Sequence, residues 1–306
     1  MSDEISIIFL KSKNITDDRF QKQFSVIKNG IKFDTCFVPV IEHKFKEAEI
    51  NFLRKILHRR RIGKEIGSKY GGLIFTSQRA VEAFASLVLE GIENGSGDHH
   101  DWPYLQDVPI YSVGPATTRA LKAIPLDNPL NVRGSESGNG ETLASFILSD
   151  YSDWYRNWDF KCPLIFVGCE RRNNIISKKL MDPNLGMNSI PVVELDVYTT
   201  SVIPTFQKDF IKSLNSKMAS DIIWIAIFSP SVGEAMIYSL DLLDSRTGRA
   251  KAKPPHTTRR IFFASIGPTT RDFLQEQFGF VVDVCAKKPT AESLEEGIME
   301  YLLNEY

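Results

Sequence analysis

The stretch GGLIFTSQRAVEAF, residues 71–84, indicates a short buried strand that leads directly into a helix. The apolar part ends at Phe75, two hydroxyl residues follow as Thr76 and Ser77, and a helix-period run begins at once. A similar stretch, IIWIAIFSPSVGEAM, returns at 222–236. A strand followed by a hydroxyl-rich helix start is therefore expected twice in one chain.

The residues at these helix starts are typical capping residues. Ser77 and Ser229 suit the N-cap position, where a side-chain oxygen accepts a hydrogen bond from a backbone N–H group. Pro230 suits the first helical position, and Ser231 with Glu234 matches the spacing of a capping box.

Short apolar runs alternate with amphipathic segments along the whole chain. Runs that indicate strands are SIIFL (6–10), KFDTCFVPV (32–40), GLIF (72–75), VPIYSVG (108–114), PLIFVG (163–168), IPVVELDVY (190–198), DIIWIAIF (221–228), RIFFASIG (260–267) and GFVVDVCA (279–286). Strand and helix in repeated succession predict an α/β fold with mainly parallel sheets. Segments 93–103, 151–160 and 245–256 are expected as surface loops.

The chain also contains an internal repeat. Ser77 lies 37 positions before Gly114, and Ser229 lies 38 positions before Gly267. The matching motifs are SVGPATTRAL (112–121) and GNGETLASFI (138–147) in the first copy, and SIGPTTRDFL (265–274) and KPTAESLEEGI (288–298) in the second. The matching order and spacing favour duplication over chance.

Two weaker similarities extend the repeat. IIFLKSKN (7–14) is similar to LIFVGCERRN (164–173), and CFVPVIE (36–42) is similar to LDVYTTS (195–201). Together these patterns predict two similar α/β lobes. A cleft between such lobes is the expected ligand site.

Each repeated motif lies where a predicted strand ends and a helix begins. Ligands bind at that edge of open parallel sheets, and helix N-termini attract phosphates or carboxylates. Gly114 and Gly267 are expected to permit a tight turn before helices that Pro115 and Pro268 open. The hydroxyls in their first turns are Thr117, Thr118, Thr269 and Thr270. Each of these residues can also be a cap that touches no ligand.

Composition excludes several classes of protein. The 306 residues are 42% hydrophobic with a formal net charge of −1, which argues against nucleic-acid binding and against disorder. No apolar run is long enough to span a membrane, and MSDEISIIFLKS lacks the pattern of a signal peptide. The four cysteines form no CxxC pair and are expected as thiols in a reducing compartment. We therefore expect a cytoplasmic protein with no nucleic-acid or membrane partner.

Several catalytic signatures are missing from the sequence. Neither GxGxxG after a strand, nor GxxxxGK followed by Ser or Thr, nor GxSxG is present, and His99 and His100 lack a spaced metal-binding partner. Tyr198 ends the run VVELDVY, where the chain should pass between lobes. It is either a packing residue or a proton donor, since a pKa of about 10 keeps a phenol protonated at neutral pH.

The ordered motifs resemble the uroporphyrinogen-III synthase family. The matching stretches are IIFLKSKN, GGLIFTSQRAVEAF, VGPATTRAL, VVELDVYTT, FSPSVGEAM, IGPTTRDFL and KKPTAESL. The resemblance implies a lyase that closes the linear tetrapyrrole hydroxymethylbilane to uroporphyrinogen III. Ring D is inverted through a spiro intermediate, water is lost, and the substrate is oriented in the cleft between lobes. The resemblance also implies that no cofactor or metal is needed, and we expect a monomer.

The resemblance further implies domain bounds and site residues. One discontinuous lobe is expected at 1–37 plus 201–306 and the other at 45–191, with connecting strands at about 38–44 and 192–200. Tyr198 is the expected catalytic proton donor. The expected substrate-binding residues are Thr76, Ser77, Thr117, Ser229, Ser231, Thr269, Thr270, Lys11 and Arg171.

Alternatives stay open at this point. Gln78 stands where the family usually has proline, so the first helix start could differ in shape. A non-catalytic bilobal module that binds an anionic small molecule would suit the same hydroxyl-rich helix starts. A nucleotide-dependent enzyme is disfavoured by the missing glycine fingerprints.

Overall fold

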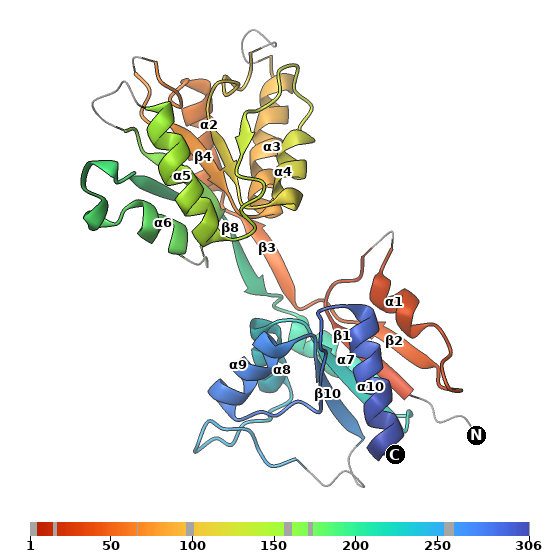
Figure 1. The fold of residues 1–306 in the computed structure, drawn as a ribbon. Coiled ribbons are helices and arrows are strands. Elements are labelled where there is room, and N and C mark those ends of the chain that lie inside the picture. The colour runs from red at the N-terminus through yellow and green to blue at the C-terminus, as the bar shows by residue number, and fades with distance from the viewer. Residues whose placement is uncertain are drawn as a thin grey trace. The chain divides into compact units, whose positions relative to one another are not determined.

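The structure is a computed structural model that describes residues 5–14, 17–65, 67–95, 101–155, 161–170, 174–253 and 260–305 (Figure 1). The chain divides into two compact units. Unit 1 comprises Met1–Glu42 and Ser201–Tyr306, and unit 2 comprises His43–Thr200. None of the described helices is long and apolar enough to cross a membrane.

Unit 1 is built on a five-stranded sheet whose paired strands all run parallel. The strand order is β11 (Val284–Cys285), β10 (Ile261–Ser265), β9 (Ile222–Ile227), β1 (Ile5–Leu10) and β2 (Phe33–Phe37). Every residue of β1 and β9 is buried. Both faces of these central strands must therefore be covered, which explains their continuous apolar runs.

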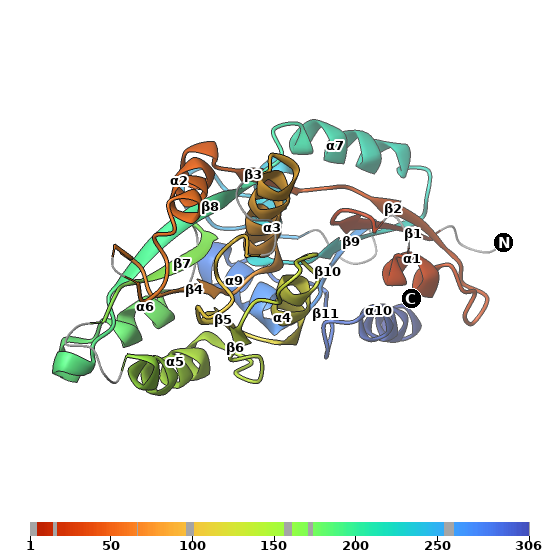
Figure 2. The same cartoon turned by 90° about the horizontal axis from the view of Figure 1, so that it is seen from above.

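Helices cover both faces of this sheet (Figure 2). Because side chains alternate along a strand, Ile8 and Leu10 lie in one core cluster and Ile7 and Phe9 in the other. The first cluster includes residues of α7 (Phe206–Ser216), α8 (Pro230–Ser239) and α9 (Pro268–Phe278). The second includes residues of α1 (Arg19–Phe24) and α10 (Ala291–Glu305).

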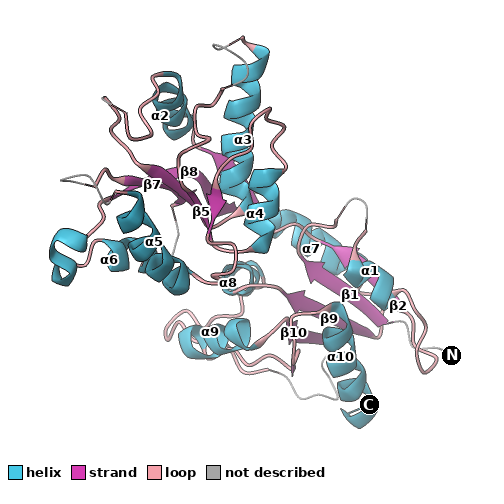
Figure 3. Cartoon of the chain, turned by 45° about the horizontal axis from the view of Figure 1, so that its top comes forward, coloured by secondary structure: helices cyan, strands magenta, loops and turns pink. Residues whose placement is uncertain are grey.

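Unit 2 has a six-stranded sheet between helices (Figure 3). Its strand order is β3 (Ile41–Phe45), β8 (Val192–Val202), β7 (Leu164–Cys169), β4 (Gly72–Phe75), β5 (Ile110–Ser112) and β6 (Val132–Arg133). One core cluster contains residues of α2 (Glu47–His58), α3 (Gln78–Glu93) and α4 (Pro115–Lys122). The other contains residues of α5 (Gly140–Trp154) and α6 (Ile175–Leu180), and a 3₁₀ segment spans Pro183–Asn188.

The two sheets share one strand order. Unit 1 runs β2-β1-β9-β10-β11, and unit 2 runs β8-β7-β4-β5-β6 with β3 added at the edge. Strand β1 thus corresponds to β7 and β2 to β8, which are the pairs that the weaker sequence similarities linked. The predicted α/β class, with two similar lobes and one of them discontinuous, is confirmed.

Strands β3 and β8 carry the chain between the units. The Lys46 amide donates to the Val197 carbonyl at 2.9 Å, and the Ile203 amide donates to the Val40 carbonyl at 2.8 Å. Residue numbers rise on one strand as they fall on the other, so this pair is antiparallel. The predicted domain bounds, 1–37 plus 201–306 and 45–191 with connecting strands at about 38–44 and 192–200, stay a prediction.

Some predicted elements have different bounds. The strand expected at 279–286 is reduced to Val284–Cys285. The loop expected at 151–160 begins later, because α5 continues to Trp154 and Tyr151 is fully buried with its hydroxyl donating to the Cys162 carbonyl at 2.7 Å. Within the other two predicted loops, residues 96–100 and 254–259 lie outside the described residues.

Gly91 provides a test of how tightly α3 packs. A methyl group at this position would overlap the buried indole ring of Trp102, whose Nε1 donates to the Val88 carbonyl at 2.9 Å. Because the overlap is with a fixed ring, we expect Gly91→Ala to lower the free energy of unfolding by about 1–3 kcal/mol. Denaturant unfolding would measure the change. Ser86→Ala, at an exposed position of the same helix, is the control with little expected effect; equal stability of the two variants would contradict this packing.

Candidate functional site

The carboxyl edge of the unit 2 sheet collects several predicted site residues. Strands β4, β5 and β7 run parallel, so their carboxyl ends meet at one edge. Thr76 and Ser77 directly follow β4, and Thr117 lies in the first turn of the helix after β5. All three residues therefore lie at the carboxyl edge of the sheet, where the chain passes from a strand into the following helix.

Ser77 caps helix α3, as predicted. Its backbone is extended, with φ −142° and ψ 146°, and its Oγ accepts a hydrogen bond from the Ala80 amide at 3.2 Å. The helix begins at Gln78. Gln78 in place of the family's proline therefore leaves the capped helix start intact.

Tyr198 reaches this serine from strand β8. The pairing of β7 with β8 slips by one residue between Gly168 and Cys169, which places Tyr198 opposite Cys169. The Tyr198 hydroxyl donates to Ser77 Oγ at 3.1 Å, and the tyrosine is only 7% exposed. Two residues that were predicted in separate roles are therefore hydrogen-bonded to each other.

The surroundings of Tyr198 keep its phenol neutral. Burial is the largest cause that raises the pKa of Tyr198 above its ordinary value, and the Cys169 thiol raises it further. The hydrogen bond with Ser77 and the charge of Arg79 act in the opposite direction but do not reverse the shift. The side chain can therefore donate a hydrogen bond throughout the neutral pH range.

His43 belongs to the same group of side chains, although the sequence reasoning passed over it. Its Nδ1 lies 3.0 Å from Thr200 Oγ1, and its ring meets Tyr198 edge-on with centroids 5.8 Å apart. Cys169 Sγ lies 3.8 Å from the same threonine oxygen. The signal that could have found His43 is the antiparallel pairing of β3 with β8. The register of that pair sets His43 opposite Thr200. Burial, and then the charge of Arg79, lower the pKa of His43, so the ring is neutral at neutral pH.

Helix α4 starts differently from the expectation. Gly114 caps it with φ −178°, an extended conformation that any residue adopts, and open space surrounds its Cβ position. The turn that Gly114 was expected to permit therefore does not require glycine. Thr117 and Thr118 are nearly buried, and the Thr118 hydroxyl is hydrogen-bonded to that of Ser112.

In unit 1, Ser229 caps helix α8. Its Oγ accepts from the Val232 amide at 3.4 Å and lies 3.3 Å from the Ser231 hydroxyl. Pro230 is the first helical residue, as predicted. The capping-box assignment of Ser231 and Glu234 is wrong, because the chain becomes helical after Ser229 and Ser231 already lies inside the helix.

Helix α9 repeats the start of α4 with one change. Gly267 is again extended, with φ 175°, while Thr270 is buried and Thr269 is exposed. The Ser265 hydroxyl is fully buried and has no hydrogen-bond partner among the residues that the structure describes. Its counterpart Ser112 is satisfied by Thr118, but Arg271 replaces that threonine in this copy.

Lys11 follows β1 at the same edge of the unit 1 sheet. It forms an ion pair with the buried carboxylate of Asp18. Its Nζ also lies 5.1–5.9 Å from the ring centroids of Phe20, Phe37 and Phe228. The positive charge of Lys11 is thus already paired with the negative charge of Asp18. Arg171 lies outside the described residues.

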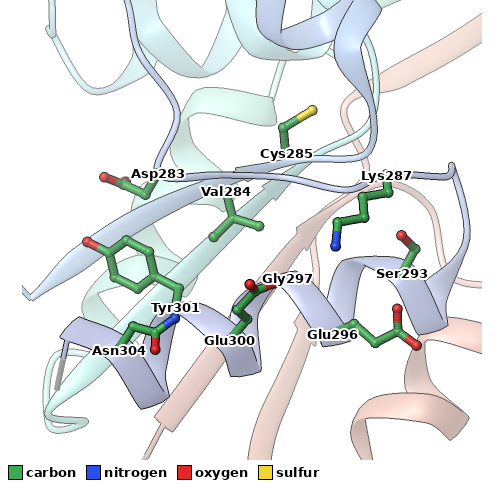
Figure 4. Close-up of a pocket in the computed structure, with 10 residues that line it drawn as sticks. All are labelled: Asp283, Val284, Cys285, Lys287, Ser293, Glu296, Gly297, Glu300, Tyr301 and Asn304. Atoms are coloured by element: carbon green, nitrogen blue, oxygen red, sulfur yellow. The ribbon is translucent and has the colours of Figure 1, made fainter.

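A separate pocket of about 260 Å³ lies between β11 and α10 in unit 1 (Figure 4). Its lining includes Asp283, Cys285, Lys287, Glu300 and Tyr301, and none of the predicted site residues. Across the described ranges, no group of three or more His, Cys, Asp or Glu side chains is arranged to hold a metal ion.

Comparisons with known proteins give a consistent result. The family model described as "Uroporphyrinogen-III synthase HemD" matches residues 26–296. A Schizosaccharomyces pombe protein named uroporphyrinogen-III synthase is 28% identical over 294 residues, which are 96% of each chain. A crystal structure of a mutant uroporphyrinogen III synthase from the bacterium Thermus thermophilus matches with a TM-score of 0.50 and 14% identity, covering 98% of this chain and 99% of that one. This last likeness concerns the fold alone.

The raised pKa of Tyr198 can be measured directly. We expect the ultraviolet phenolate signal that distinguishes the protein from Tyr198→Phe to appear only above the ordinary pKa of about 10. A tyrosine whose pKa is raised in the folded state contributes stability that is full below the unfolded pKa and is lost as the pH rises through the folded pKa. The stability difference between the two proteins should therefore shrink above pH of about 10. Ionisation of Tyr198 near neutral pH would contradict this environment.

Proposed function

The chain belongs to the uroporphyrinogen-III synthase family, and from this premise we propose how its own residues perform the reaction. The enzyme is a cyclising lyase of haem biosynthesis: it closes hydroxymethylbilane to uroporphyrinogen III with inversion of ring D and loss of water. The observation that carries the proposal is the hydrogen bond between Tyr198 and Ser77 at the carboxyl edge of a parallel sheet.

Substrate carboxylates are proposed to bind at the helix starts. The acetate and propionate groups of the substrate are anions, and the first N–H groups of a helix are unpaired donors at its positive end. Ser77 accepts from the Ala80 amide, which leaves the amides of Gln78 and Arg79 for the substrate. Ser229 accepts from the Val232 amide, and because Pro230 has no N–H group, the Ser231 amide is the one left in the first turn of α8. The further proposed contacts are Thr76, Thr117, Ser231, Thr269, Thr270, Lys11 and Arg171.

The exposure of these residues ranks the proposed contacts. Thr76, Ser77, Ser229 and Ser231 are partly exposed, and Thr269 is exposed. A carboxylate can reach these hydroxyls without disturbing the fold. Thr117 and Thr270 are at most 5% exposed, so their proposed contact with substrate depends on a small opening of the helix start.

The chemical demand on the enzyme is mainly one of orientation. The substrate loses its terminal hydroxyl, and the resulting azafulvene must then be attacked by the substituted carbon of ring D rather than by the unsubstituted end of that ring. Holding two reacting carbons in one geometry can remove several kcal/mol from the barrier. Tyr198 is the proposed acid that assists departure of the hydroxyl, because its phenol is protonated and points to the edge.

The remaining features of the proposal concern the conditions of the reaction. Loss of water and ring closure are redox-neutral, so the reaction needs no redox cofactor. From the family resemblance we further propose that no cofactor or metal takes part. We propose a monomer, which size-exclusion chromatography would test. The four cysteines are free thiols, which supports the proposal of a reducing, cytoplasmic compartment.

The reaction can be tested with fresh hydroxymethylbilane. We expect the protein to yield uroporphyrinogen III, whereas unaided cyclisation yields isomer I, and chromatography separates the two. Tyr198→Phe should lower turnover about 10²–10⁴-fold, the range for loss of a general acid. Tyr238→Phe, at a tyrosine that is 59% exposed on α8, is the matched control and should retain full turnover. Isomer I alone would favour a binding module over the synthase, and unchanged turnover in Tyr198→Phe would remove the tyrosine from the mechanism.

A further inference from the structure

We propose that Ser77 is the group that hands a proton to the departing hydroxyl of the substrate, and that Tyr198 acts behind it as the resupplying donor. This proposal rests on the synthase activity proposed above. It changes the role of Ser77 from a carboxylate ligand to the catalytic contact, and it makes Tyr198 a relay residue.

The hydrogen bonds at Ser77 allow few other arrangements. A serine hydroxyl has one hydrogen to donate and two lone pairs that accept. Ser77 Oγ accepts from the Ala80 amide at 3.2 Å and from the Tyr198 hydroxyl at 3.1 Å. Both lone pairs are therefore engaged within the protein. The hydroxyl hydrogen is left to point away from both donors, toward a ligand at the sheet edge.

Accessibility favours the serine over the tyrosine. Tyr198 is 7% exposed and its own hydrogen is committed to Ser77, whereas Ser77 is partly exposed. A hydroxyl that accepts a hydrogen bond from a phenol is also a stronger donor, because neighbouring hydrogen bonds polarise one another. Ser77 thus combines access to the substrate with activation from behind.

The group around Tyr198 holds the relay in place. The ring of His43 lies against its edge, Thr200 bonds His43, and Cys169 is its partner across the strand pair. Burial raises the pKa of Tyr198 overall, and the charge of Arg79 partly offsets this by favouring the phenolate form that the relay passes through. His43 belongs to β3 and Cys169 to β7, so strands on both sides of β8 contact or pair with Tyr198.

The proposed step balances in atoms and electrons. The C–O bond to the terminal hydroxyl breaks with its electron pair on oxygen, while the pyrrole nitrogen lone pair leaves a cationic azafulvene. The Ser77 proton joins the departing oxygen as water, and the Tyr198 proton moves to Ser77 Oγ. The substituted carbon of ring D bonds to the exocyclic carbon of this azafulvene and gives the spiro intermediate. The bond from that ring D carbon to its original bridging carbon then breaks, and the bridging carbon becomes the exocyclic carbon of a second azafulvene. The unsubstituted carbon of ring D bonds to this bridging carbon and loses its hydrogen as the ring regains aromaticity. That proton returns to Tyr198, so the enzyme ends unchanged.

The duplicated unit supplies an internal comparison. Ser229 caps its helix as Ser77 does, but the second neighbour of its Oγ is the Ser231 hydroxyl at 3.3 Å. In the sequence similarity that links 36–42 to 195–201, Pro39 stands at the position of Tyr198. Ser229 thus lacks a phenol behind it within the described residues. One activated serine agrees with a substrate that loses one hydroxyl.

A double-mutant cycle tests the relay. Turnover to isomer III would be measured for Ser77→Gly, Tyr198→Phe and the double variant. Glycine keeps a competent N-cap to within a few tenths of a kcal/mol but removes the hydroxyl. We expect each single change to lower turnover by about the same factor, within about 10²–10⁴-fold, and the double change to lower it no further, since both break one chain of donors. Ser77→Thr, which keeps cap and hydroxyl, should rescue turnover to within about 10-fold of the unaltered enzyme.

Two controls separate the relay from a structural role. Ser229→Gly alters the corresponding N-cap of α8. No hydrogen bond joins Ser229 to Tyr198 in the described structure, so the fold losses of turnover from Ser229→Gly and Tyr198→Phe should multiply in the double variant. The solvent isotope dependence of turnover should show two moving protons in the unaltered enzyme and one in Tyr198→Phe. Thermal unfolding would verify that each variant is folded.

The outcomes distinguish the relay from the activity on which it rests. Production of isomer I alone by the unaltered protein would overturn both. Production of isomer III with effects of Ser77→Gly and Tyr198→Phe that multiply would overturn the relay and leave the synthase intact. Full turnover in Ser77→Gly, with Tyr198→Phe still slow, would overturn the relay as well, since the phenol would then act on the substrate directly.

Discussion

The unpaired N–H groups at the helix N-termini are the constraint on which the binding chemistry depends. Parallel strands bring their carboxyl ends to one edge, and each following helix starts there. The first N–H groups of a helix have no partner within it, so they require a side chain, water or an anion. Ser77 and Ser229 each accept from a single amide. A substrate rimmed with carboxylates suits the amides that remain, without a protein of net positive charge.

Duplication explains why such edges occur in both units, and divergence explains why they differ. The sheets share one strand order, yet Ser77 has Tyr198 beside it where Ser229 has Ser231. Binding of anions can be repeated on both copies, because each capped helix start keeps an amide that its serine does not use, although Pro230 leaves α8 with one N–H group fewer than α3. Assistance to a single departing hydroxyl needs only one polarised donor, and unit 2 alone carries it among the described residues.

Local patterns were sufficient for most of the fold. Strands β1 and β9 are buried on both faces, so their apolar runs are visible in the sequence. Capping by Ser77 and Ser229 was also predictable, since a cap involves only residues within one helical turn. The end of α5 was missed because it depends on the burial of Tyr151. The Tyr151 hydroxyl donates to the carbonyl of Cys162, a later residue that the local helix pattern does not include.

By itself, the sequence determined the α/β class, the internal repeat and the hydroxyl-bearing helix starts, because each depends on neighbouring residues or on self-similarity. Only the tertiary structure decided that Tyr198 donates to Ser77, since the two lie 121 positions apart. A register slip between Gly168 and Cys169 places Tyr198 opposite Cys169, and pairing of β3 with β8 brings the His43 ring into contact with the Tyr198 ring. Such contacts are set by which strands pair and in which register, and no local pattern contains that information.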